Sequence, residues 1–175
     1  MKDHSAADLT DDVRIHGAQP LITPWVLAEE LPLPSAQRHE IAGARRAIER
    51  VLAGEDRRML AIVGPCSVHD PAALLEFASQ LQTACAPLSD AILPVLRVYF
   101  EKPRTVVGWK GLINDPDLDG SFRINKGLRQ ARRVLLDVAA LGLPAASEFL
   151  DTTFGQYYAD LVSFGAIGAR TVESQ

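Results

Sequence analysis

The chain has 175 residues, the size of one domain or of part of a larger one. Its 47% hydrophobic content is ordinary for a packed domain, and its net charge of -4 argues against nucleic acid as a partner for the whole surface. Two cysteines, no signal-peptide core and no apolar run near the roughly 20 residues of a membrane span predict a cytoplasmic protein without membrane contact.

The N-terminal part, residues 1–58, is predicted to form an arm followed by a helix. Residues 1–19 are polar. Residues 20–34 hold four prolines among apolar residues, a composition that favours an extended arm docked on another surface. The arm and its helix are therefore expected to be separate from a catalytic region over residues 59–175.

Two helices are expected in the N-terminal part. Pro24 is suited to the first position of a short helix, with Thr23 as its N-cap. A longer helix is predicted from Ser35, because apolar residues recur at helical spacing, and Gly54 is expected to end it.

After residue 58, short apolar runs alternate with helical periodicity. Strands are predicted over 59–67, 91–100, 144–150 and 166–172, and helices over 70–86, 126–142 and 153–165. Asp70 is expected to cap its helix, with Pro71 at the first helical position. Residues 101–123, rich in Gly, Pro, Asp and Asn, predict a long loop.

The resulting β-α-β-α-β-α-β order predicts an α/β fold with a parallel sheet covered by helices. A doubly wound sheet and a (β/α)8 barrel both begin in this way. Four strands are half of an eight-stranded barrel, which typically needs about 250 residues. If the fold is a barrel, only its first four β/α units are present in this chain.

Polar side chains gather where the predicted strands end, which is where both architectures bind ligands. Four cations are expected to converge there: Arg97, Lys102, Arg104 and Arg170. Arginine forks suit the planar oxygens of carboxylates and phosphates, and lysine supplies a point charge. The pattern therefore predicts small, anionic, phosphorylated substrates.

Several of these residues also have a structural interpretation. Cys66 is typical of a buried core thiol, because no CxxC or HExxH spacing indicates a metal site. Arg97 and Arg170 could be buried ion-pair residues, with Glu148 or Glu173 as partners.

Other residues favour plain structural roles. Lys102 and Arg104 could be solvated loop residues. His69 is more typical of a surface or capping residue than of a base, and Cys85 of packing within a helix. Three arginines on the predicted helix 126–142 are expected to lie on a solvated face: Arg129, Arg132 and Arg133.

Four segments carry a resemblance to a known family. They are IVGPCSVHDP (62–71), RVYFEKPRTVVGWKGLINDPDLDGSF (97–122), GLPAASEFLD (142–151) and GAIGARTVESQ (165–175). Together they resemble type I 3-deoxy-D-arabino-heptulosonate-7-phosphate (DAHP) synthases, from about residue 11 onward. The resemblance implies a (β/α)8 barrel with an N-terminal extension and a divalent metal. It also implies condensation of phosphoenolpyruvate with erythrose 4-phosphate, the first step of the shikimate pathway.

The resemblance also implies roles for individual residues. Cys66 matches a metal-binding cysteine, and a thiolate among imidazole and carboxylate ligands suits Mn, Fe, Co or Zn. The phosphoenolpyruvate site would comprise Arg97, Lys102, Glu148, Ala169 and Arg170, of which Lys102 and Arg170 are the expected catalytic residues. The erythrose 4-phosphate site would comprise Pro103, Arg104 and Thr105.

The family's other metal ligands, a histidine, a glutamate and an aspartate, lie beyond the fourth strand. The chain alone is therefore expected to be an inactive fragment of the enzyme. An aromatic amino acid effector is implied near the arm, where Asp11 and Asp12 resemble an acidic motif. Gly155-Gln156 stands where phenylalanine- or tyrosine-sensitive forms often read Pro-Gln, which favours tryptophan. Arms that pack between subunits imply a homodimer or homotetramer, so residues 1–58 are expected to serve regulation and oligomerisation.

Two other functions remain open. A truncated, non-catalytic chain would bind an aromatic amino acid or a full-length synthase subunit. A 3-deoxy-octulosonate-8-phosphate synthase would share phosphoenolpyruvate chemistry, but the KPRT and GWKGL segments favour the DAHP enzyme.

Overall fold

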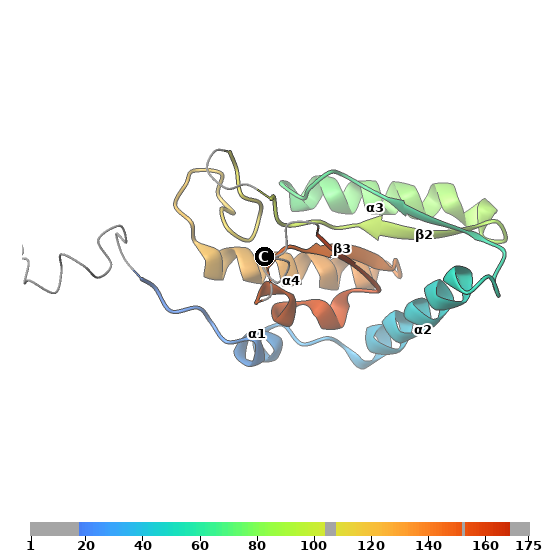
Figure 1. Cartoon of the computed structure of the whole chain (residues 1–175), viewed down its shortest axis with the longest axis horizontal. Helices are drawn as coiled ribbons and strands as arrows, with labels where there is room; N and C mark the ends of the chain where they lie inside the picture. The colour runs from blue at the N-terminus through green and yellow to red at the C-terminus, as the bar shows by residue number, and fades with distance from the viewer. Residues whose placement is uncertain (1–17, 104–107, 152, 169–175) are drawn as a thin grey trace, which may run out of the picture.

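The computed structural model describes residues 18–103, 108–151 and 153–168. Within these ranges the chain forms one parallel sheet covered by helices, as the alternating pattern predicts (Figure 1). No helix in the described part of the chain is long and apolar enough to cross a membrane.

The sheet has four strands in the order β1-β2-β3-β4, and every neighbouring pair is parallel. The strands are β1 Met59–Val63, β2 Ile92–Arg97, β3 Ala145–Phe149 and β4 Phe164–Ile167. A doubly wound sheet reverses its strand order, whereas a barrel keeps the order of the chain. The sheet is therefore a half-barrel, and the doubly wound alternative is wrong.

The strand ends differ from those predicted. Strands β1 and β2 stop several residues early, and β4 starts at Phe164 rather than at residue 166. A strand ends where the neighbouring strand no longer pairs with it, and the pairing of β2 with β3 is confined to Leu96 and Arg97. The alternation of side chains nevertheless continues past β2, since Val98 and Phe100 are 0% and 1% exposed.

Helices α3 (Pro71–Cys85) and α4 (Ile124–Ala140) cover one face of the sheet (Figure 1). Leu74 of α3 and Leu135 of α4 belong to the same apolar core as Leu96 of β2. The side chain of Asp70 accepts hydrogen bonds from the amides of Ala72 and Ala73, at 2.9 and 3.3 Å, which confirms the predicted cap. A short 3-10 helix, η2 (Ala86–Leu88), follows α3.

Helices α1 (Pro24–Glu30) and α2 (Ser35–Leu52) precede the sheet, and their predicted starts are confirmed. Ile48 of α2 packs against Leu93 and Val95 of β2, on the face opposite α3 and α4. The longer helix therefore covers one end of the inner face of the half-barrel.

The predicted helix over 153–165 is wrong. Two 3-10 helices, η3 (Phe154–Tyr157) and η4 (Ala159–Leu161), occupy this segment before β4 begins. Tyr157 and Tyr158 are adjacent and are 4% and 1% exposed. Tyr158, with φ -148°, interrupts the helical backbone.

The long loop after β2 is confirmed, and it is held closely against the strand. Glu101 and Gly111 form an isolated antiparallel bridge, and Leu112 donates to the carbonyl of Phe100 at 2.7 Å. Gly111 has φ +104°, and a Cβ there would lie 2.1 Å from the Phe100 oxygen. Only glycine allows this approach, which fixes the backbone of Glu101.

Candidate active site

A cavity of about 360 Å³ lies at the carboxyl ends of β1, β2 and β3. It is lined by Cys66, Ser67, Arg97, Glu101, Lys102, Pro103 and Glu148. Parallel strands bring their C-terminal ends to one edge, which is why residues far apart in sequence meet there. The structure thus brings together five residues predicted for the site: Cys66, Arg97, Lys102, Pro103 and Glu148.

Six other predicted site residues lie outside the described part of the chain. They are Arg104, Thr105, Ala169 and Arg170 of the substrate sites, and Asp11 and Asp12 of the regulatory site.

Arg97 ends β2 and reaches toward the loop after β1. Its guanidinium carbon lies 4.0 Å from the centre of the Tyr99 ring, and Nη2 donates to the carbonyl of Cys66 at 3.4 Å. Within the described residues, neither Glu148 nor any other carboxylate forms an ion pair with Arg97. Arg97 therefore does not form the ion pair with Glu148, and its positive charge faces a cavity that suits an anion.

A close approach between the first two strands supports this position. A Cβ on Gly64 would lie 2.6 Å from the carbonyl oxygen of Arg97 and 3.0 Å from its Cβ. Glycine at this position lets the end of β1 lie directly against Arg97.

Lys102 and Cys66 meet across the cavity. The ammonium Nζ of Lys102 lies 3.0 Å from Sγ of Cys66. Cys66 is exposed, so the interpretation as a buried core thiol is wrong. A neighbouring cation favours the thiolate, which is the form of cysteine that attacks electrophiles and binds metals.

Glu101 is a site residue that the sequence interpretation did not single out. Its side chain lines the cavity, yet the residue is only 7% exposed. Burial raises its pKa from 4.5 to about 7, and the charges of Asp151 and Glu148 add to the rise. Arg97, Tyr99 and Glu101 alternate with the core residues Val98 and Phe100, so a period of two extended past the strand would have found it.

A metal site is not complete within the described residues. They contain no group of three or more His, Cys, Asp or Glu side chains that could hold a metal ion. Cys66 supplies one sulfur donor, and its described neighbour is the ammonium of Lys102 rather than a second ligand. Among the described residues, Cys66 therefore supplies one of the several donors that a metal ion needs.

The residues predicted for effector specificity, Gly155 and Gln156, lie on η3. A Cβ on Gly155 would lie 3.0 Å from Cδ1 of Phe149, closer than side chains normally pack. Any residue larger than glycine here must therefore displace the Phe149 ring by a few tenths of an ångström.

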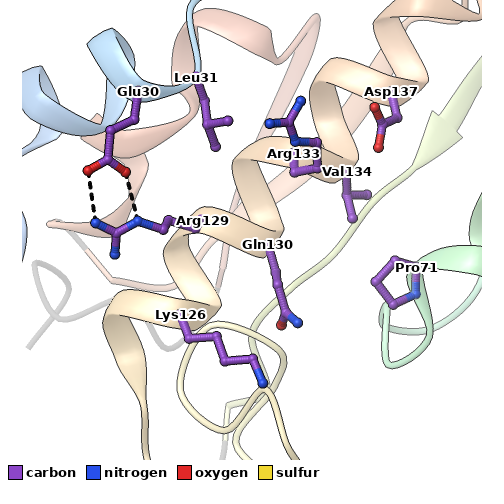
Figure 2. A pocket seen from close by; sticks show the side chains of 9 residues that line it. All are labelled: Glu30, Leu31, Pro71, Lys126, Arg129, Gln130, Arg133, Val134 and Asp137. Carbon is purple, nitrogen blue, oxygen red and sulfur yellow. Dashed lines mark hydrogen bonds and ion pairs between the residues drawn. The ribbon is translucent and has the colours of Figure 1, made fainter.

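A larger cavity, of about 620 Å³, lies elsewhere, along α4 (Figure 2). Its wall includes the ion pair between Arg129 and Glu30, with Nε–Oε2 at 2.7 Å, and the side chain of Arg133. It contains none of the predicted site residues, and for that reason the smaller cavity at the strand ends is the candidate active site.

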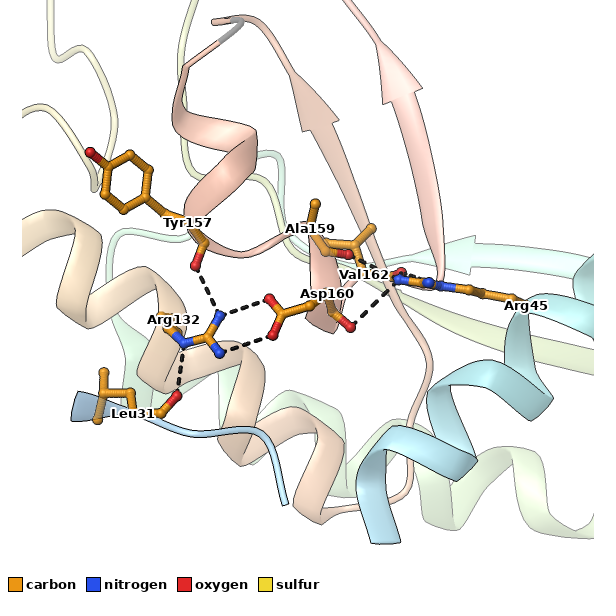
Figure 3. A network of polar contacts seen from close by, with 7 residues as sticks. All are labelled: Leu31, Arg45, Arg132, Tyr157, Ala159, Asp160 and Val162. Carbon is orange, nitrogen blue, oxygen red and sulfur yellow. Dashed lines mark hydrogen bonds and ion pairs between the residues drawn. The ribbon is translucent and has the colours of Figure 1, made fainter. Parts of the chain in front are cut away.

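The predicted solvated face of α4 is only partly confirmed. Arg133 is exposed, and Arg129 pairs with Glu30. Arg132 is 2% exposed and forms a two-point ion pair with Asp160 (Figure 3). The solvated interpretation is wrong for Arg132, because a residue from another element satisfies its charge.

Comparison with known proteins places these residues in a family context. The model of the DAHP synthetase I family matches residues 33–175. The chain is 54% identical over 165 residues to a phospho-2-dehydro-3-deoxyheptonate aldolase of Amycolatopsis methanolica, covering 94% of the chain and 81% of the relative. It is also 54% identical to a Trp-sensitive relative from Buchnera aphidicola and to a Phe-sensitive relative from Escherichia coli, and it spans 48% and 47% of their lengths.

A solved structure shares the fold. The phospho-2-dehydro-3-deoxyheptonate aldolase of Francisella tularensis superposes with a TM-score of 0.87 at 50% identity, over 92% of this chain and 47% of that chain. Residues 33–175, which the family model matches, contain the half-barrel and the cavity at its strand ends. The chain belongs to the DAHP synthetase I family.

Proposed function

We propose that this chain carries part of the active site of a DAHP synthase, a transferase that condenses phosphoenolpyruvate with erythrose 4-phosphate and releases phosphate. The observation that carries the proposal is the convergence of Arg97, Lys102 and Cys66 on one cavity at the strand ends. Two cations around a cavity of this size favour an anionic substrate.

Arg97 and Lys102 would hold the carboxylate and phosphate of phosphoenolpyruvate. Arg170 and Ala169 would complete this subsite together with Glu148, and Lys102 and Arg170 would be the catalytic cations. Such a cluster orients two anions that would otherwise repel each other, and it stabilises charge in the transition state.

Pro103, with Arg104 and Thr105, would receive erythrose 4-phosphate. Pro103 lines the cavity directly after Lys102, so the two substrates would lie side by side. The guanidinium of Arg104 and the hydroxyl of Thr105 would bind the sugar phosphate.

The divalent metal of the family, Mn, Fe, Co or Zn, would take Cys66 as its only donor from the described residues. Its remaining donors would come from elsewhere in the complete enzyme.

We infer that the half-barrel belongs to a (β/α)8 barrel. In the described residues, β1 and β4 each pair on one side only, and four further β/α units would close the sheet. We further propose a cytoplasmic homodimer or homotetramer in which residues 1–58 serve regulation, with an aromatic amino acid as effector. Gly155-Gln156 favours tryptophan, although identity is equal to the Trp-sensitive and Phe-sensitive relatives.

The test is complementation. The chain is mixed with the C-terminal half of the E. coli relative, produced separately, and phosphate release from phosphoenolpyruvate is measured with and without erythrose 4-phosphate. Binding of phosphoenolpyruvate to the chain alone is followed by NMR. We expect Arg97→Met to abolish both signals and Arg133→Met, on the outer helix, to leave both intact.

Three outcomes would contradict the proposal. Absence of both binding and phosphate release would remove the substrate assignment. Turnover with arabinose 5-phosphate instead of erythrose 4-phosphate would favour the octulosonate enzyme. Tryptophan binding without phosphoenolpyruvate binding would favour a non-catalytic chain.

A further inference from the structure

A buried arginine joins three elements outside the candidate active site (Figure 3). Arg132 of α4 is 2% exposed. Its Nη1 and Nη2 donate to the two carboxylate oxygens of Asp160, at 2.7 and 2.9 Å. Nε donates to the carbonyl of Leu31 at 2.8 Å, and Nη1 also donates to the carbonyl of Tyr157 at 2.9 Å. One guanidinium therefore binds two parts of the chain at the same time. They are the end of the N-terminal segment (residues 20–31) and the segment that contains η3 and η4 (residues 154–162), called the η3–η4 connection below.

The N-terminal segment, residues 20–31, has further contacts with the same surroundings. The hydroxyl of Tyr157 donates to the carbonyl of Ile22 at 2.6 Å. Asn125, near the start of α4, accepts from the amide of Ile22 at 2.8 Å and donates to the carbonyl of Pro20 at 3.0 Å. Leu27 is 0% exposed within the main core. The segment is therefore docked on η3 and α4 by hydrogen bonds and by apolar packing.

The η3–η4 connection is also fixed from the opposite side. Arg45 of α2 donates to the carbonyls of Ala159 and Val162 at 2.9 and 2.8 Å (Figure 3). Two arginines from different helices thus bind backbone carbonyls of this one segment, those of Tyr157, Ala159 and Val162.

Tyr158 extends the network to the cavity. Its ring stacks on Phe149, with centroids 5.8 Å apart and planes inclined by 12°. It meets Phe100 edge to face, with centroids 5.5 Å apart and planes inclined by 75°. Phe149 directly follows Glu148, and Phe100 directly precedes Glu101, so the two aromatic partners adjoin the two carboxylates of the cavity wall.

We propose that Arg132 is a positioning residue that couples the docking of residues 20–31 to the shape of the cavity, through Tyr157 and Tyr158. Displacing the segment would leave Nε of the buried Arg132 and the hydroxyl of Tyr157 without their acceptors, the carbonyls of Leu31 and Ile22, so the N-terminal segment and the η3–η4 connection move together. A ligand or subunit that displaces the segment would change the cavity. By linkage, an anion bound in the cavity would strengthen docking of the segment. This coupling does not depend on which reaction the cavity performs.

The chain offers a reporter at the cavity and matched controls. Cys66 lies in the cavity, and Cys85, at the end of α3, serves as an internal reference. Arg132→Met removes the buried charge, and Arg133→Met removes an exposed charge from the next position of the same helix. Hydrogen exchange reports on residues 20–31 and 154–162, and the rate at which iodoacetamide alkylates Cys66 reports on the cavity. Both are measured peptide by peptide in mass spectrometry.

In Arg132→Met we expect exchange over residues 20–31 and 154–162 to accelerate by at least about tenfold, because the four hydrogen bonds of the buried guanidinium are lost. We expect the alkylation rate of Cys66, relative to Cys85, to change by about threefold or more, the size of a modest coupling between sites. Arg132→Lys should restore part of both effects, and Arg133→Met should show neither.

Tyr157→Phe removes only the hydrogen bond from the tyrosine hydroxyl to the carbonyl of Ile22. This variant tests the proposed coupling if Arg132→Met unfolds the whole chain. We expect it to accelerate exchange over residues 20–31 and to alter the Cys66 rate in the same direction as Arg132→Met. The proposal is overturned if either folded variant frees residues 20–31 while the Cys66 rate stays that of the wild type.

Discussion

Lys102 places its ammonium nitrogen 3.0 Å from the sulfur of Cys66, although 36 positions separate the two residues in the chain. The contact exists because Cys66 follows β1 and Lys102 follows β2, and these strands are adjacent and parallel. It gives the candidate active site an exposed thiol beside a fixed positive charge.

We therefore predict that Lys102→Met slows alkylation of Cys66 by iodoacetamide by about tenfold, because the neighbouring cation no longer favours the thiolate. The rate is measured by mass spectrometry with Cys85 as internal reference. Lys110→Met, in the same loop, is the control and should leave the rate unchanged. Equal rates in both variants would contradict an interaction between the two side chains.

The raised pKa of Glu101 predicts an unusual dependence of stability on pH. Because its folded-state pKa is raised from 4.5 to about 7, the fold favours the protonated carboxyl. This contribution is fully present below about pH 4.5 and is lost as the pH rises through about 7. The free energy of unfolding should thus fall by at most about 3 kcal/mol between pH 5 and 8 on account of this group.

Glu101→Gln tests the pH effect, because the amide resembles the protonated acid and does not titrate. Urea unfolding at several pH values should show a smaller decline for the variant, which becomes the more stable protein at pH 8. Parallel curves for the wild type and the variant would show that Glu101 does not titrate in this range.

Two glycines in helices are expected to respond in opposite ways to alanine. A Cβ on Gly127 of α4 would lie 2.1 Å from the carbonyl oxygen of Ile113, a backbone atom with no room to move. Gly127→Ala should lower the free energy of unfolding by about 1–3 kcal/mol or more. At Gly43 of α2 nothing lies within 4 Å, so Gly43→Ala should raise it by about 0.5–1 kcal/mol. Urea midpoints measure both, and a neutral Gly127→Ala would refute the close contact.

The effector assignment makes a prediction at Gly155. In the complemented enzyme, tryptophan should inhibit phosphate release, and phenylalanine and tyrosine should have less effect. Gly155→Pro should weaken inhibition by tryptophan, because the added atoms displace Phe149 from its contact with η3. An enzyme that does not respond to tryptophan would remove this assignment.

Much of the fold could be predicted because its signals are local. Asp70 and Pro71 start α3 as predicted, since a side-chain cap and a missing amide act within one turn. The apolar runs placed four strands in the right order, and the polar residues at their ends identified the cavity. The exact strand ends were less predictable, because they depend on where a neighbouring strand stops.

The sequence by itself determined the β/α alternation, the family, and the residues that gather where the strands end. Only the tertiary structure decided that Arg132 is buried, because its partner Asp160 lies 28 positions away and Leu31 lies 101 positions away. The same holds for the pKa of Glu101, which depends on burial and on Asp151, and for residues 154–161, where long-range contacts replace helical hydrogen bonds. Local periodicity encodes which face of an element is apolar, whereas burial of a charge depends on what the rest of the chain places against it.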